Sequence, residues 1–143
     1  MIIMAVDLGD ARTGIAVCDK FELLASPVGT ITEYNKDKLI DKINNLVTEY
    51  KPEEIVLGNP VNMDGTEGAR AEMYKEFGKK LEEKTGKKVI MWDERATTVS
   101  ATEILNFTNT RGKKRKAIID TVSAVLILES YMEFRKNDGF SVS

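Results

Sequence analysis

The 143-residue sequence predicts one α/β domain, spanning residues 1–143, on a mixed sheet of about five strands. Two observations support this fold class. Apolar runs separated by short turns fill the first 31 residues, which is typical of an antiparallel meander. Beyond them, segments with helical spacing alternate with short, continuously apolar runs, which is typical of parallel strands covered by helices. A chain of this length also buries enough surface for a core of its own.

The spacing of apolar residues gives each element in order. The elements expected are strands at 2–7, 14–19 and 22–31, a helix at 37–50, a strand at 54–58, a helix at 66–84, a strand at 87–92, and helices at 97–106 and 114–134. Asp37 is the expected N-cap of the first helix. The second helix has an apolar line made of Ala69, Met73, Phe77 and Leu81.

Composition excludes several classes of function. Twenty-one basic and 23 acidic residues nearly cancel, so nucleic-acid binding would need a local basic patch. The sequence has no histidine, which excludes Ser-His-Asp and Cys-His catalysis and histidine metal ligands. Cys18 is the only cysteine, which is typical of a reducing compartment. No apolar run approaches the roughly 20 residues of a membrane span. We expect a cytoplasmic protein that does not bind membranes.

Acidic residues follow two of the predicted strands. Asp7 ends the first strand, and Asp93 and Glu94 follow the strand at 87–92. If these strands are parallel, their acids lie at one edge of the sheet, where ligands of α/β sheets bind. Asp120 lies in the last predicted helix, where a lone charge facing the sheet would be costly. Helical spacing places it on one face with Ala117, Ala124, Ile127 and Tyr131.

Converging carboxylates need a cation. At about 4 Å and an effective dielectric near 20, each pair of carboxylates repels by roughly 4 kcal/mol. Oxygen ligands without histidine favour Mg²⁺ or Mn²⁺ over Zn²⁺, and two such ions are the usual device for cutting phosphodiesters. Each acid also has a purely structural interpretation: Asp7 as a turn cap, Asp93 as a helix cap, Glu94 as a partner of Arg95, and Asp120 as a partner of Lys116.

Basic residues that could hold nucleic acid gather before the last helix. The run RGKKRK holds five basic residues in six and reads as a loop beside the acids. A solvated loop without function is the alternative. Trp92 is expected in the core rather than stacked on bases. The candidate nucleic-acid contacts are Arg12, Thr13, Asn62, Arg70, Arg95, Arg111, Lys113, Lys114, Arg115 and Lys116.

Four segments, in order, carry a family resemblance. They are VDLGDARTGIAV, IVLGNPVNMDGTEG, DERATT and IDTVSAVLILESYM, and together they resemble the YqgF/RuvX family of Holliday-junction-resolvase-like proteins. The resemblance runs from Met4 to about Phe134. It implies a ribonuclease H-like fold, whose five-stranded mixed sheet has its first three strands antiparallel and helices on both faces. It also implies acidic metal ligands at Asp7, at the Asp93-Glu94 pair and at Asp120, with Asp7, Glu94 and Asp120 catalytic.

The resemblance further implies a nuclease that uses Mg²⁺ or Mn²⁺, with two ions. Its expected role is processing the precursor of 16S ribosomal RNA, with structured RNA and ribosomal precursor particles as partners, as a monomer or a homodimer. Resolution of branched DNA is an alternative, as is a non-catalytic nucleic-acid-binding module. The DLGDARTG hairpin is also typical of the phosphate-binding turn of actin-like ATPases, which gives a further competing hypothesis.

Overall fold

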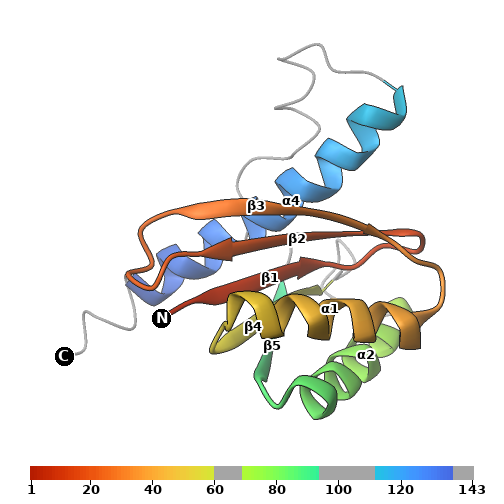
Figure 1. Ribbon diagram of the computed structural model, residues 1–143, viewed down its shortest axis with the longest axis horizontal. Coiled ribbons are helices and arrows are strands. Elements are labelled where there is room, and N and C mark those ends of the chain that lie inside the picture. Colours follow the sequence, from red (N-terminus) through yellow and green to blue (C-terminus); the bar gives the residue numbers. More distant parts are fainter. Residues whose placement is uncertain (60–68, 94–111, 137–143) are drawn as a thin grey trace.

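The computed structural model describes residues 1–59, 69–93 and 112–136, with side chains omitted at 59, 69–70, 93 and 112–121. Its sheet has five strands in the order β3-β2-β1-β4-β5 (Figure 1). None of the helices in these ranges has the length and apolar character needed to cross a membrane. The elements are β1 (Ile3–Asp7), β2 (Arg12–Cys18), β3 (Ala25–Thr32), α1 (Lys36–Tyr50), β4 (Glu54–Asn59), α2 (Ala69–Thr85), β5 (Lys88–Asp93) and α4 (Gly112–Phe134).

The strand directions confirm the predicted mixed sheet. β1 pairs antiparallel with β2, and β2 pairs antiparallel with β3, so the first three strands form a meander. β4 inserts beside β1 in parallel, and β5 continues in parallel beside β4. A parallel neighbour needs a crossover connection, and α1 and α2 provide these between β3, β4 and β5.

Helices cover both faces of the sheet, as predicted. On one face Met4 and Val6 of β1 join a buried cluster with residues of α1 and α2. On the other face Ile3 and Ala5 join a second cluster with residues of α4. Successive residues of β1 therefore alternate between two cores, which explains why this strand is apolar throughout. Figure 1 shows α1 and α2 on the side opposite α4.

The predicted strand at 22–31 is wrong at its beginning. Residues 19–24 form a turn, and β3 begins at Ala25. The Asp19 carboxylate accepts hydrogen bonds from the backbone N–H groups of Phe21, Leu23 and Leu24 at 3.2, 2.8 and 2.8 Å. Glu22 takes a left-handed φ of 56° within this turn. A short acidic side chain that binds nearby N–H groups competes with strand pairing, which the apolar pattern does not reveal.

Two helix predictions need correction at their N-terminal ends. Asn35, not Asp37, caps α1, because its extended backbone lets its side chain accept from the N–H of Lys38 at 3.0 Å. The run RGKKRK is not a loop from residue 112 onward, since α4 already begins at Gly112. Lysine and arginine are good helix formers, so the basic run extends the helix. The predicted helix at 97–106 lies outside the described residues.

The buried face of α2 also differs from the predicted apolar line. Phe77 and Leu81 are buried as expected, but Met73 is 38% exposed. Tyr74, the next residue, takes the core position and is 3% exposed. In α4 the predicted face is confirmed where side chains are described, since Ala124, Ile127 and Tyr131 are buried. Trp92 is partly buried and packs edge-on against Tyr131, with ring centroids 5.2 Å apart, so it lies against the core on the α4 face.

Candidate active site

The carboxyl ends of β1, β4 and β5 meet at one edge of the sheet, as the sequence predicts. Val6 of β1 is aligned with Leu57 of β4, and Asn59 at the end of β4 is aligned with Asp93. Asp7 and Asp93 are thus the last residues of two strands that flank β4. Two strand spacings and a one-residue stagger put their backbones about 10 Å apart. The two acidic positions therefore share the edge at which a site can form.

Asp7 lies on the α4 face of the sheet. Ile3 and Ala5 pack against α4, and strand alternation places Asp7 on the same side, where it is partly buried. Helix position 120 lies one turn before Ala124, which is fully buried in that cluster. The backbone of α4 therefore brings position 120 to the face on which Asp7 lies.

The alternation of β5 separates position 93 from this face. Ile90 and Trp92 pack with the α4 cluster, while Val89 and Met91 pack with the α1 and α2 cluster. Position 93 follows the period of Val89 and Met91 and so falls on the side away from α4.

The turn after Asp7 is held from outside at every carbonyl of residues 8–11. The Tyr74 hydroxyl donates to the carbonyl of residue 8, Leu8, at 2.5 Å, in a buried contact from α2. The Lys36 ammonium donates to the carbonyls of residues 9 and 10 at 3.1 and 3.4 Å. The N–H of Glu33 donates to the carbonyl of residue 11 at 2.9 Å. Elements from both crossover segments therefore fix the backbone that follows Asp7.

Gly9 is required by this turn for steric reasons. A Cβ atom built on Gly9 would lie 2.2 Å from the carbonyl oxygen of Arg12, a distance that real side chains do not show. The turn therefore folds so tightly on itself that no side chain fits at this position. The glycine of the DLGD segment thus serves the backbone path that joins Asp7 to Arg12.

Arg12 and Thr13 have opposite positions at the start of β2. Arg12 is partly exposed and alternates with Gly14 and Ala16, which puts it on the α4 face with Asp7. Thr13 is 0% exposed and lies on the other face, with Ile15. The burial of Thr13 gives no support to its predicted contact with nucleic acid, because strand alternation turns its hydroxyl into the core.

The structure describes the other predicted nucleic-acid contacts only in part. Arg70 is in the first turn of α2, and Lys113, Lys114, Arg115 and Lys116 are in the first turns of α4; only their backbones are placed. Glu94, Arg95, Asn62 and Arg111 lie outside the described residues. Their roles stay predictions.

The described side chains contain no group of three or more Asp, Glu, His or Cys residues that could hold a metal. Asp7 is a described carboxylate at the shared edge, and the remaining candidate ligands are at positions 93, 94 and 120. All of these are carboxylates, and a set of oxygen donors fits Mg²⁺ or Mn²⁺. The metal site stays a prediction built on Asp7.

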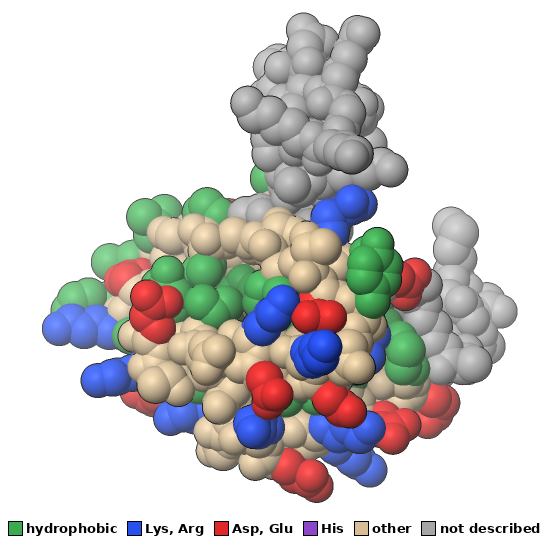
Figure 2. All heavy atoms as spheres, turned by 45° about the vertical axis from the view of Figure 1, so that its right-hand side comes forward, with side chains coloured by type: hydrophobic (Ala, Val, Ile, Leu, Met, Phe, Trp, Pro, Cys, Tyr) green, Lys and Arg blue, Asp and Glu red, His purple; other side chains and the backbone are tan. Residues whose placement is uncertain are grey.

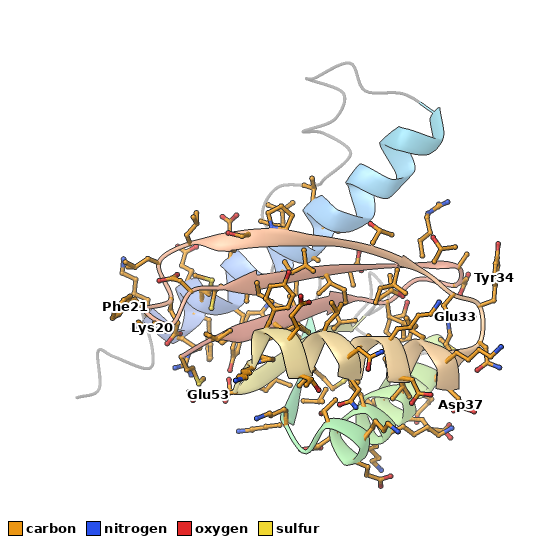
Figure 3. The ribbon with its side chains drawn as sticks, viewed as in Figure 1. Lys20, Phe21, Glu33, Tyr34, Asp37 and Glu53 are labelled. Atoms are coloured by element: carbon orange, nitrogen blue, oxygen red, sulfur yellow. The ribbon has the colours of Figure 1, made fainter. Side chains whose placement is uncertain are left out.

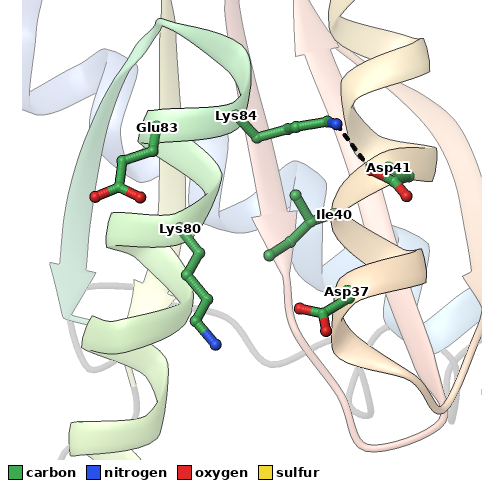
Figure 4. A pocket seen from close by; sticks show the side chains of 6 residues that line it. All are labelled: Asp37, Ile40, Asp41, Lys80, Glu83 and Lys84. Carbon is green, nitrogen blue, oxygen red and sulfur yellow. Dashed lines mark ion pairs between the residues drawn. The ribbon is translucent and has the colours of Figure 1, made fainter.

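Among the residues that the structure describes, the other titratable and charged groups do not suggest a second centre. Burial raises the pKa of the Cys18 thiol, which keeps it protonated and fits a packing role. A hollow between α1 and α2 is lined by residues of both signs, and its Lys84 ammonium pairs with Asp41 at 3.2 Å (Figure 4). It lies beside helices that cover the face opposite α4. On the face that Figure 2 shows, acidic and basic side chains are interspersed.

Sequence reasoning missed the residues that hold the turn. Tyr74 follows Met73, which fits the predicted apolar spacing of the helix, and Lys36 is one lysine among several at the start of α1. Their hydrogen bonds join residues 66 and 27 positions apart. No local pattern marks such partners; the buried hydroxyl of Tyr74 is found only once α2 is placed on the sheet.

The fold has counterparts among solved resolvases. The structure of Thermus thermophilus RuvC matches with a TM-score of 0.59, at 13% identity, over 97% of each chain. Fowlpox virus resolvase, solved with Holliday junction DNA, matches with a TM-score of 0.57 at 17% identity, over 94% of this chain and 98% of that one. At these identities the likeness shows the fold, and it confirms the predicted ribonuclease H-like architecture.

Sequence relatives are much closer. A protein of Lachnospira eligens named "Putative pre-16S rRNA nuclease" is 42% identical over 95% of this chain and 99% of its own length. A protein of Agathobacter rectalis with the same name is 39% identical over 96% of this chain and 98% of its own. The model of the RuvX family, described as Holliday junction resolvase, matches residues 1–134. The chain therefore belongs to the RuvX family, whose relatives bear the name of nucleases.

Proposed function

We propose that this protein is a divalent-metal-dependent endonuclease that cuts the precursor of 16S ribosomal RNA. Its proposed active site is at the edge of the sheet where β1, β4 and β5 end. Relatives about 40% identical over nearly the whole chain bear the name of that activity. Such a substrate places the protein in the cytoplasm, with ribosomal precursor particles as partners. The chemistry itself needs only one copy of the chain.

One observation carries the proposal. Asp7 ends a parallel strand on the α4 face, and α4 brings position 120 to that same face. Two acidic positions far apart in the sequence are thereby on one face of the sheet, which supports a shared site. A carboxylate at the end of a buried strand is costly unless a partner compensates it, and a cation is the partner that several acids can share.

We assign metal binding to Asp7, Glu94 and Asp120. Position 93 falls on the face away from α4, so within the acidic pair we prefer Glu94 to Asp93. A bound Mg²⁺ or Mn²⁺, or a pair of them, would activate water and stabilise the leaving oxygen. The chain's own part is to hold the carboxylates in place through the fixed turn and to bind phosphates through Arg12 and the basic start of α4.

Resolution of a Holliday junction is the second candidate. It is favoured by the family description and by the likeness of the fold to two resolvases. Symmetric cutting of two strands would require a two-fold dimer. A dimer is therefore a property that distinguishes the two candidates, independently of the cleavage assay.

The test is cleavage of labelled precursor-like RNA hairpins and four-way DNA junctions with Mg²⁺, Mn²⁺ or chelator. Asp7→Asn removes the charge at the edge and should abolish cleavage. Asp41→Asn is the matched control, because this exposed carboxylate pairs with Lys84 on the opposite side of the sheet. Cutting of RNA alone would support the first candidate, and cutting of junctions alone the second. Binding without cleavage in every metal would overturn both and favour a binding module.

A further inference from the structure

Tyr34 is an exposed aromatic residue beside the candidate active edge. Its side chain is 76% exposed and projects outward at the end of the molecule where the β1–β2 turn lies (Figure 3). Other exposed large apolar residues, Phe21, Leu23 and Leu24, belong to the β2–β3 turn at the opposite end of the strands. Tyr34 therefore differs from them in its position rather than in its exposure.

The backbone that carries Tyr34 is attached to the turn after Asp7 on both sides. The preceding residue, Glu33, donates its N–H to the carbonyl of Ala11 at 2.9 Å. On the other side, Lys36 lies two residues after Tyr34, and its side-chain ammonium donates to the carbonyl of Gly9 at 3.1 Å. Tyr34 is thus held between two anchors on the segment that links Asp7 to Arg12.

The neighbouring side chains make this segment stiff and reduce its negative charge. The Glu33 carboxylate accepts from the N–H of Asn35 at 3.2 Å and pairs with the Lys42 ammonium at 3.0 Å. Asn35 caps α1 and so fixes the other side of Tyr34. Because Lys42 compensates the carboxylate of the adjacent Glu33, a phosphate that approaches the ring meets less repulsion from it.

We propose that Tyr34 is a stacking platform for an unpaired nucleobase of the substrate, at the end of the sheet where the proposed cleavage site lies (Figure 3). The inference rests on the proposed function. An exposed aromatic face binds a base by stacking, and it accepts any base because each has a π face. Bases within a duplex already stack on their neighbours, whereas single-stranded nucleotides present a free face. Tyr34 therefore selects substrates with an unpaired nucleotide beside the cleavage edge.

The preformed position of the ring matters for affinity. A side chain on a mobile loop would have to be ordered when the substrate binds, and that ordering costs free energy. Here the cap, the ion pair, the Glu33 N–H bond and the Lys36 ammonium bond fix the segment in the free protein. Most of the stacking free energy is then available for binding.

The experiment measures binding by fluorescence anisotropy in chelator, so that no cleavage occurs. The probes are an RNA hairpin with a single-stranded tail, the same hairpin with a blunt end, and the DNA versions of both. The proteins are wild type, Tyr34→Ala, Tyr34→Phe and Phe21→Ala. Phe21 is the matched control, since it is an aromatic residue 69% exposed at the far end of the strands.

We expect Tyr34→Ala to bind the tailed hairpin about 5-fold to 100-fold more weakly and the blunt hairpin as wild type does. Tyr34→Phe keeps a stacking face and should bind within twofold of wild type, as should Phe21→Ala. A fluorescent base analogue in the tail should be quenched by wild type and not by Tyr34→Ala. The DNA arms show whether stacking also accepts deoxynucleotides.

Two results would overturn the proposal. Equal binding of the tailed hairpin by wild type and Tyr34→Ala would remove the stacking role and leave the proposed nuclease function intact. Equal weakening on tailed and blunt hairpins would show that Tyr34 does not select unpaired bases. If wild type bound none of the four probes, the proposed function and the stacking role would both fail.

Discussion

The hydroxyl of Tyr74 makes a prediction that can be worked out from the structure. Tyr74→Phe removes one oxygen atom and keeps the ring, which is 3% exposed in the core. The lost hydrogen bond is the buried contact of 2.5 Å with the carbonyl of Leu8. No large cavity forms, so the main cost is a buried carbonyl without this donor, about 1–3 kcal/mol. With a urea m-value of about 2 kcal/mol per molar, the unfolding midpoint should fall by about 0.5–1.5 M.

The matched control is Tyr131→Phe. Its hydroxyl donates to Glu54 at 2.9 Å, at the amino end of β4 and far from the Asp7 edge. Both variants lose a hydroxyl hydrogen bond from a tyrosine in the core, so both should be destabilised. Only Tyr74→Phe should speed amide hydrogen exchange in residues 8–12, because only there does the hydroxyl hold the turn.

Cleavage provides the second readout for the same pair of variants. If the turn positions Asp7, Tyr74→Phe should lower kcat more than it raises KM, since the substrate contacts remain. Tyr131→Phe should leave both constants near the wild-type values. Equal stability of Tyr74→Phe and wild type, or equal exchange in residues 8–12, would refute the claim that this hydroxyl holds the turn.

Two further predictions concern the turn and the opposite end of the sheet. Gly9→Ala should cost about 1–3 kcal/mol and reduce cleavage, because its Cβ would meet the carbonyl of Arg12. Gly78→Ala should lose less in the same urea titration, because the tightest neighbour of its Cβ, at 3.2 Å, is the sulfur of the flexible Met91 side chain; equal loss in both would contradict the steric account. The Arg135 guanidinium donates to Glu22 at 2.6 Å and holds the pKa of that carboxyl below its usual value. A lowered pKa stabilises the fold above the unfolded value, about 4.3, and this stabilisation is lost as pH falls through the folded pKa. Glu22→Gln should therefore be less stable than wild type at pH 7, and the difference should shrink as the pH falls below the unfolded value; a difference independent of pH would contradict this.

Local signals were sufficient where one chain segment decides its own structure. The period of apolar residues predicts the meander, the crossovers and both faces of the core, because each strand or helix must bury one apolar side whatever its neighbours are. Local signals fail where two neighbouring residues are equally suited to the same role. Asn35 and Asp37 can both cap a helix, and Asn35 is the residue whose extended backbone lets its side chain accept from the N–H of Lys38. Met73 and Tyr74 are adjacent on α2, and only the placement of the helix on the sheet decides which is buried.

The candidate site divides in the same way. Asp7 at the end of an apolar strand follows from the sequence. Its place at one edge with position 93 is predicted on the condition that the strands are parallel, and the structure meets that condition. Three features do not follow from the sequence: the exposure of Tyr34, the burial of Thr13, and the hydrogen bonds of Tyr74 and Lys36 to the turn. These depend on alternation register and on hydrogen bonds between residues distant in the chain. Local sequence determines which elements form, whereas side-chain contacts at the site are decided only when those elements pack together.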